Sequence, residues 1–393
     1  MADAHPVIEQ LHVENYRVLR DVTFERLTPL TVLFGPNGSG KSTVFDVFAF
    51  LYDAMTQGLR KACDDRNGVA QIRSKGCEDN IVIELKYRQG KGEKLITYRL
   101  EIGDQAGRPV VRQERLSWAT TGDSGRPRNI VDLNNGQGNV YDDEDGTHRL
   151  EKLESPDVLA VSALGQLSRH PNVSALRRFI TGWYLSYINA DQTRTTPSVG
   201  PSEHLSRTGD NLPNVLQYLQ ENDPQRLARI FSAMRARVPQ LDDLRAVPLQ
   251  DGRLMLQLRD RAFSEPILAR FTSDGTLKLL AYLTVLYSAE PPAIIGIEEP
   301  ENQLHPKLLS VLAEELREAS AASQVFVSTH SPYLVDEMRA EEVWLLHRGE
   351  AGFAKAVRAS SVPIITTMIE SGGKLGDLWM EGYFPNADPI ASV

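Results

Sequence analysis

The chain has 393 residues, a formal net charge of −9 at pH 7, and two cysteines, Cys63 and Cys77, that lack metal-ligand spacing. This length suffices for one large domain or two. The negative net charge argues against a broadly basic nucleic-acid-binding surface, but it does not exclude a local basic groove. No apolar run is long enough to cross a bilayer and no apolar signal segment follows Met1, so we expect a cytoplasmic protein with reduced cysteines and no membrane partner.

The first motif is a glycine-rich loop between a strand and a helix. We expect strands near 7–14, 22–26 and 30–34, and after the loop an apolar, buried helix from Lys41 to about Gln57. A loop in this setting is typical of the Walker A motif, whose backbone N–H groups and helix N-terminus bind phosphate. Its residues, with the sequence GPNGSGKST, are Gly35, Pro36, Asn37, Gly38, Ser39, Gly40, Lys41, Ser42 and Thr43.

The whole loop is therefore expected to bind ATP. In such a loop Lys41 neutralises the β- and γ-phosphates, and the Ser42 hydroxyl coordinates Mg²⁺. A GTPase of the Ras or translation-factor type would need an NKxD-like guanine-reading motif, and the sequence contains none.

The next segment alternates apolar and polar residues. Residues 81–118 predict antiparallel strands at 81–87, 94–102 and 109–118. Residues 121–148 are rich in Gly, Asp, Asn and Ser, and we interpret them as a solvated loop.

The sequence of the middle of the chain, residues 165–245, predicts a helical insertion that forms an arm or lid. It is too short for a long coiled coil, and no heptad pattern persists in it. On a helix at 224–238, three arginines border the apolar face, and they are either snorkelling surface side chains or contacts to a nucleic-acid backbone. These residues are Arg226, Arg229 and Arg237.

A second helix start with anion-binding character follows. Ser273, Asp274 and Gly275 precede an apolar helix that runs to about Ser288, and a serine N-cap with free N–H groups can bind phosphate. One nucleotide does not need two phosphate-binding loops in the same chain, so we expect this turn to contact the ATP held by a second copy. The prediction is a head-to-tail homodimer with two ATP molecules between the protomers.

An apolar strand with an acidic end comes next. Residues 293–306 read AIIGIEEPENQLHP, which is the Walker B arrangement, with carboxylates delivered to the metal at the strand's carboxyl end. Glu298 is expected to hold Mg²⁺ and Glu299 to activate the attacking water. The alternative is a surface acidic turn.

The strand at 324–329 ends in a polar tip that carries His330. Because one helix, at about 305–320, separates it from the Walker B strand, we expect His330 to reach the γ-phosphate and sense it. A structural histidine is the alternative.

The order of these motifs resembles the ABC-type ATPase heads of the RecF, SMC and OLD proteins. The sequence is most similar to the RecF-like predicted ATPases of the prokaryotic AAA (AAA_21-type) family. Residues 11–20 resemble the family's opening strand, which implies that Arg17 helps to hold the nucleotide. Residues 161–167 resemble its Q-loop, which implies that Gln166 links metal and water. Residues 205–213 and 375–382 also resemble family segments.

The sequence departs from the family pattern at two positions. Asp274 stands where the ABC signature usually has glycine, and similar forms occur in the RecF-like group. His305 stands where SMC heads usually carry an aspartate, whereas OLD-type heads have His-Pro there.

The resemblance implies an α/β fold of the P-loop ABC-head type, two-lobed, with a mixed central sheet, a flanking antiparallel sheet at about 81–118 and a helical insertion. We expect the head to comprise residues 1–164 and 246–393, with the signature, Walker B and histidine segments in 265–335. An OLD-type nuclease would append a TOPRIM module. The stretch after His330 has no Asp-x-Asp pair, so we expect no nuclease activity from this chain.

Three functions remain open. The first is an ATPase that acts on DNA, in repair, maintenance or anti-phage defence. The second is an ATP-gated regulatory scaffold that controls a separate effector protein such as a nuclease or toxin. The third, a module that binds ATP and scarcely hydrolyses it, is disfavoured by the Glu298–Glu299 pair.

Overall fold

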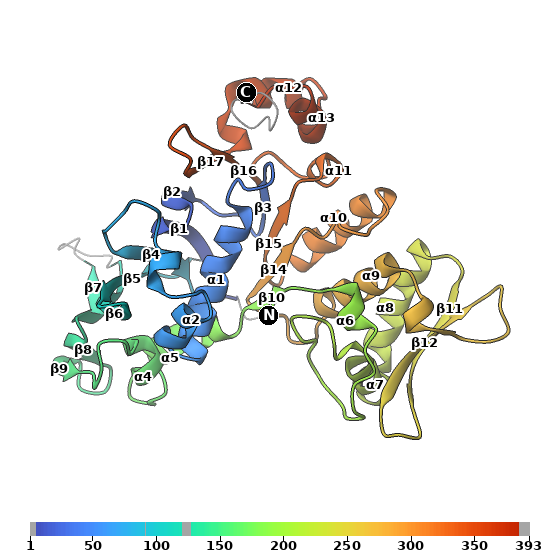
Figure 1. Cartoon of the computed structure of the whole chain (residues 1–393), viewed down its shortest axis with the longest axis horizontal. Coiled ribbons are helices and arrows are strands. Elements are labelled where there is room, and N and C mark those ends of the chain that lie inside the picture. Colours follow the sequence, from blue (N-terminus) through green and yellow to red (C-terminus); the bar gives the residue numbers. More distant parts are fainter. Residues whose placement is uncertain (1–4, 91, 120–126, 385–393) are drawn as a thin grey trace. The chain divides into compact units, whose positions relative to one another are not determined.

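The structure, a computed structural model, describes residues 5–90, 92–119 and 127–384. The chain divides into two compact units, of which the first comprises residues 1–183 and 328–393 and the second residues 184–327 (Figure 1). The units divide at positions other than the predicted insertion boundaries of 165 and 245. The assignment of residues 165–245 as an insertion stays a prediction.

The first unit contains a wholly antiparallel sheet in the order β2-β1-β4-β5-β6-β7-β8-β9. Burial alternates along β4 and β5, as expected for strands with one face on a core. Its strands are β1 (Val7–Tyr16), β2 (Leu19–Glu25), β4 (Ile81–Arg88), β5 (Ile96–Gln105), β6 (Arg108–Trp118), β7 (Arg128–Asn134), β8 (Gln137–Asp142) and β9 (Thr147–Lys152).

Strands β7 to β9 correct the predicted loop at 121–148, of which residues 120–126 lie outside the described residues. The β7–β8 hairpin turns at Asn135 and Gly136, both with positive φ, of 49° and 76°. An Asn-Gly pair is the usual sequence of such a two-residue hairpin turn. The polar composition concealed this turn signal and the buried side chains of Val131, Leu133 and Val140.

The first unit also contains strands that support the glycine-rich loop. Strand β3 (Leu30–Phe34) pairs in parallel with β16 (Val343–Arg348), which pairs antiparallel with β17 (Ala354–Arg358). All five residues of β3 are buried. The helices of this unit are α1 (Lys41–Thr56), α2 (Leu59–Asp64), α3 (Val69–Ile72), α4 (Ala160–Leu164), α5 (Pro171–Thr181), α11 (Pro332–Val335), α12 (Pro363–Glu370) and α13 (Leu375–Met380).

Helix α1 packs against α2, α4 and α5 of this unit. Its apolar side chains are buried, as the sequence predicts, and the Phe48 ring meets the Trp183 ring edge-on at 5.5 Å between centroids. The helix is thus held from several sides, so that its first turn presents the loop residues on a rigid support.

In the second unit, the short strand β10 (Tyr184–Ser186) pairs in parallel with β14 (Ile294–Glu298). Helices α7 and α8 lie beside the β11–β12 hairpin, and α9 packs against α8 (Figure 1). The remaining elements are α6 (Ala190–Thr193), α7 (Leu212–Asn222), α8 (Pro224–Arg237), β11 (Leu241–Pro248), β12 (Leu254–Asp260), β13 (Ile267–Leu268), α9 (Asp274–Leu286) and α10 (Lys307–Ala319). Strand β15 (Gln324–Thr329) runs from the second unit into the first.

Within the described parts of the chain, no helix is both long enough and apolar enough to cross a membrane.

Candidate nucleotide-binding site

The loop between β3 and α1 has the backbone that a phosphate cradle requires. Gly35, Gly38 and Gly40 have φ values of 154°, 75° and 115°, which side chains rarely permit. A Cβ on Gly35 would lie 2.2 Å from the carbonyl oxygen of Leu346, and one on Gly40 would lie 3.0 Å from the Ala354 Cβ. Glycine is therefore required here both for conformation and for close packing against β16 and β17.

Lys41 fills the inside of this loop. Its side chain belongs to a residue only 4% exposed, and Nζ donates hydrogen bonds to the carbonyl oxygens of Gly35, at 2.7 Å, and Pro36, at 3.1 Å. The Ser39 hydroxyl is buried without a hydrogen-bond partner. A loop that concentrates one ammonium, a helix N-terminus and a spare hydroxyl fits a phosphate group well. Ser42, the expected Mg²⁺ ligand, is exposed at the start of α1.

Arg348, at the end of β16, is a loop contact that the sequence did not suggest. Its Nε donates a hydrogen bond to the Gly38 carbonyl oxygen at 2.5 Å, and its Nη1 donates to that of Gly352. It therefore braces the outer side of the loop. An arginine at a strand end carries no distinctive signal, so only the structure identifies it.

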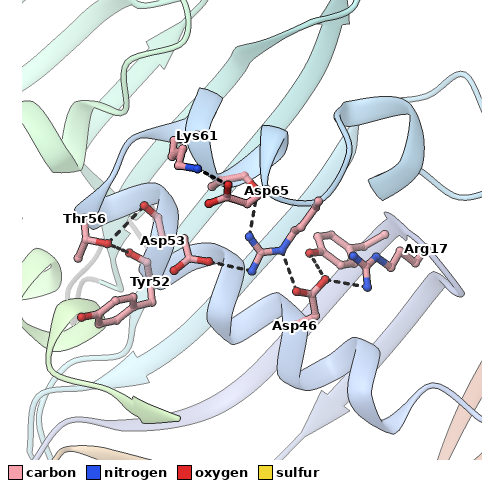
Figure 2. Close-up of polar contacts among 10 residues, drawn as sticks. Arg17, Asp46, Tyr52, Asp53, Thr56, Lys61 and Asp65 are labelled. Carbon is pink, nitrogen blue, oxygen red and sulfur yellow. Dashed lines mark hydrogen bonds and ion pairs between the residues drawn. The ribbon is translucent and has the colours of Figure 1, made fainter. Parts of the chain in front are cut away.

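Arg17 belongs to a network centred on Asp46 of α1, one helical turn beyond Ser42 (Figure 2). Its Nη1 lies 3.1 Å from Asp46 Oδ2, which also accepts a hydrogen bond from the Tyr16 hydroxyl at 2.7 Å. Burial and the Asp46 charge raise the pKa of Tyr16 well above its ordinary value, so its hydroxyl remains a donor. Arg17 thus lies beside the helix that carries the loop, and its expected contact with the nucleotide stays a prediction.

The structure does not bring Gln166 to the loop. Gln166 is exposed just after α4, and its Nε2 donates to the Ser162 carbonyl oxygen at 3.0 Å. The Ser162 hydroxyl in turn donates to the carbonyl oxygen of Met55, near the last turn of α1. That end lies about 20 Å along the helix from Ser42. We therefore correct the expectation that Gln166 binds the metal and omit it from the proposed site.

The acidic strand end lies in the second unit. Strand β14 is buried up to Ile297, and Glu298, its last residue, is half-buried. Glu299 has φ of 43°, so the chain leaves the extended conformation there. The chain therefore turns at Glu299, directly after the last residue of the strand. Glu299 Oε2 accepts a hydrogen bond from Asn302 Nδ2 at 2.9 Å.

The Ser-Asp-Gly turn begins helix α9, also in the second unit. The Ser273 hydroxyl caps the helix by accepting a hydrogen bond from the Thr276 N–H at 3.3 Å. The Asp274 carboxylate accepts hydrogen bonds from Arg194 and, at 3.1 Å, from Gln303 Nε2. The helix start has the expected serine cap, and Asp274 is bonded to side chains of its own unit.

His330 directly follows β15 and is half-buried. The Ser331 N–H donates to the Thr329 hydroxyl at 3.0 Å, which fixes the turn that carries the imidazole. Its predicted sensing of the γ-phosphate stays a prediction.

The three arginines of α8 have different surroundings. Arg226 is 8% exposed and donates to the Thr284 carbonyl oxygen at 3.0 Å, and burial lowers its pKa. Arg237 binds Glu315 at 3.1 Å, whereas Arg229 is exposed and lies over the Tyr287 ring at 5.0 Å. Arg226 and Arg237 therefore bind groups within their own unit, and the alternative of a nucleic-acid contact stays a prediction for the three arginines.

Comparison with solved structures identifies the fold. An SMC head bound to the C-terminal winged-helix domain of ScpA is similar over 89% of this chain and 96% of its own, with a TM-score of 0.56 and 15% identity. An Smc head domain with an extended coiled coil, bound to the C-terminal domain of ScpA derived from Pyrococcus furiosus, is similar over 93% of this chain and 100% of its own, with a TM-score of 0.52 and 13% identity. These similarities confirm the predicted fold class.

Sequence comparison identifies the family. The protein named Endonuclease GajA, from Bacillus cereus (strain VD045), is 36% identical over 84 residues, which are 20% of this chain and 14% of GajA. This chain thus spans only a small part of that relative. The family model AAA_21, described as "AAA domain, putative AbiEii toxin, Type IV TA system", matches residues 30–336. The chain therefore belongs to the AAA_21 family of ATPases and has the fold of an SMC-, RecF- and OLD-like ABC-type head.

Proposed function

We propose that this protein binds and hydrolyses ATP with Mg²⁺ in a head-to-tail homodimer. The observation that carries the proposal is the loop of glycines at 35, 38 and 40, which surrounds the nearly buried ammonium of Lys41. Family membership supports nucleotide hydrolysis.

Each proposed role follows from the chemistry of the side chain. Lys41 and the loop N–H groups bind the phosphates, and Ser42 and Glu298 would hold Mg²⁺, which neutralises phosphate charge when bound. Glu299 accepts a proton from the attacking water, and His330 contacts the γ-phosphate. Because the loop and the two glutamates belong to different units, their assembly around one ATP is part of the proposal.

The dimer completes each site with the partner's helix α9. This helix has 13 residues and begins with a serine cap, so its N–H groups and its dipole favour an anion. We propose that Ser273 and Gly275 contact the ATP held by the other protomer.

A DNA-related process, in repair, maintenance or anti-phage defence, is the primary biological proposal. The name of the partial relative, an endonuclease, supports it. The second candidate is an ATP-gated scaffold for a separate effector. The internal bonds of Arg226 and Arg237 support this second candidate, because Arg226 is buried, Arg237 is half-buried and only Arg229 of the three is fully exposed.

The test is steady-state ATP hydrolysis by wild type and Lys41→Ala, each with and without single-stranded and duplex DNA. We expect hydrolysis by wild type and none by the variant, because Lys41→Ala removes the ammonium that binds the phosphates. Stimulation by DNA supports the first process, and indifference to DNA supports the scaffold. Absence of hydrolysis by wild type under every condition contradicts the proposed ATPase.

A further inference from the structure

The loop that follows β14 is bonded to the first two turns of α9, within the second unit. Lys278 Nζ donates hydrogen bonds to the carbonyl oxygens of Asn302, at 3.0 Å, and Glu299, at 3.4 Å. Closer to the helix start, Gln303 Nε2 donates to Asp274 Oδ2 at 3.1 Å. The helix that begins with the Ser-Asp-Gly turn thus contacts the loop of the proposed catalytic base at two separate points.

Lys278 is an unusual residue for its position. It is 5% exposed in a helix whose other side chains from Leu277 to Leu286 are apolar or uncharged. Burial lowers the pKa of its ammonium, whereas the charges of Glu301 and Glu299 raise it. A buried ammonium is costly unless hydrogen bonds compensate it. Here the carbonyl groups of Glu299 and Asn302 provide those hydrogen bonds. The loop must therefore keep the conformation that points both carbonyl groups at the buried ammonium.

The backbone that Lys278 holds is strained. Glu299 and Gln303 have φ values of 43° and 70°, in the left-handed region that non-glycine residues seldom occupy. Such a conformation persists only where the surroundings determine it. Between these two residues, the Asn302 N–H donates to the Glu299 carbonyl oxygen at 3.2 Å, and Lys278 binds the same oxygen.

Asp274 supplies the second contact between the helix start and the loop, and this contact gives a reason for an aspartate at this position. This residue stands where related signatures usually have glycine. Its carboxylate is bonded by Gln303 and by Arg194, which also donates to the Thr272 carbonyl oxygen at 2.7 Å. Immediately beside it, a Cβ on Gly275 would lie 2.6 Å from the Gln303 carbonyl oxygen. The turn and the loop are therefore in direct contact, and Asp274 joins them.

We propose that Lys278 and Asp274 are positioning residues that join the loop carrying Glu299 to the Ser-Asp-Gly turn (the signature turn) at Ser273. The inference rests on the proposed function. In the dimer, the turn contacts the partner's ATP while Glu299 acts on the ATP of its own protomer. The two contacts therefore link the two ATP sites through one chain, and binding at one site sets the geometry of the base at the other.

The experiment compares Lys278→Met with Lys278→Arg in steady-state hydrolysis and in binding of a fluorescent ATP analogue. We expect Lys278→Met to lower kcat about tenfold or more, as displacement of a catalytic group does, while the analogue's Kd changes less than about twofold. Lys278→Arg should restore much of kcat, because it retains a donor cation. An unchanged kcat, or an equal loss of analogue binding, would overturn the inference.

A double-variant measurement tests whether Lys278 acts through Glu299. Adding Lys278→Met to Glu299→Gln should lower the residual kcat by less than about twofold, since residues that act as a unit are strongly non-additive. An independent tenfold loss in that background contradicts the positioning role.

A substitution at an exposed residue tests the same inference in case Lys278→Met fails to fold. Gln303→Ala removes the Asp274 contact at an exposed position and should also lower kcat, whereas the exposed Gln240→Ala in the same unit should not. If wild type hydrolyses ATP while Lys278→Met and Gln303→Ala match it, this inference fails and the proposed function stands. If wild type does not hydrolyse ATP, the proposed function itself fails.

Discussion

Arg66 Nε donates a hydrogen bond to Asp46 Oδ1 at 2.7 Å, and this contact ties the loop-bearing helix α1 to the segment after α2. Asp46 also pairs with Arg17 (Figure 2), and it accepts a hydrogen bond from the Tyr16 hydroxyl. Arg66 extends the network to Asp53, two helical turns further along α1, at 3.0 Å. One carboxylate thus holds the β1–β2 turn and the segment after α2 against the helix that presents Lys41.

Asp46→Ala should therefore destabilise the protein. Arg66, whose side chain is 9% exposed, would keep only Asp53 as its acidic partner. Because Asp46 is half-buried and Asp53 still pairs with Arg66, losing these charged hydrogen bonds costs about 2 kcal/mol. We expect a fall of that order in the free energy of unfolding, measured by urea denaturation. The matched control is Asp64→Ala, which breaks an exposed pair with Arg60 and should change it by less than about 0.5 kcal/mol. Equal effects of the two substitutions contradict the buried network.

Glu299→Gln should separate binding from chemistry. The amide cannot accept the proton of the attacking water, so kcat should fall by about 10²–10⁴-fold, while ATP binding is retained and the ATP-bound dimer accumulates. Light scattering of the variant with ATP and Mg²⁺ measures that dimer. Hydrolysis at the wild-type rate would reject Glu299 as the base.

Glu114 predicts a pH dependence of stability. It is fully buried on β6 and accepts hydrogen bonds from the N–H groups of Ala160 and Val161 and from the Tyr98 hydroxyl. Burial raises its pKa from 4.5 to about 7, although the hydrogen bonds from Val161, Ala160 and Tyr98 lower it. The folded chain therefore binds more protons than the unfolded chain between pH 4.5 and about 7, so this group's contribution to stability falls as pH rises through that window.

The size of this contribution is on the order of 3 kcal/mol. Glu114→Gln removes the titration, so urea denaturation at pH 5 and pH 7.5 should show a smaller loss of stability with pH than wild type shows. Other groups titrate equally in both proteins and cancel in the comparison. The same pH dependence in both proteins would contradict a raised pKa at Glu114.

Much of the local structure was predictable from the sequence. Strand β3 and helix α1 were expected with nearly their observed bounds, since an apolar run and a glycine-rich loop define both. The β7–β9 strands were missed, because polar composition masked an Asn135-Gly136 turn that is itself a hairpin signal. Strand β10 has only three residues, too few for a period to emerge.

The candidate site also contains features that the sequence predicted and positions that it did not. Glycines of the loop and the Ser273 cap follow from local rules, and the structure has the expected geometry at both. The positions of Gln166 and Arg226 depend on tertiary packing, which sequence periodicity does not encode. Lys278 could have been noticed, because it is the one basic residue within the apolar run of α9, but its contacts with Glu299 and Asn302 required the structure.

The most direct test of the head-to-tail site is a mixing experiment with Lys41→Ala and Ser273→Arg. Each variant alone should be inactive, because one lacks the phosphate-binding lysine and the other blocks the signature turn. In a mixed dimer, the intact loop of the Ser273→Arg chain meets the intact turn of the Lys41→Ala chain. We therefore expect ATP hydrolysis to reappear when the two are combined. A mixture as inactive as its components, or full activity of Ser273→Arg alone, would contradict the proposed shared site.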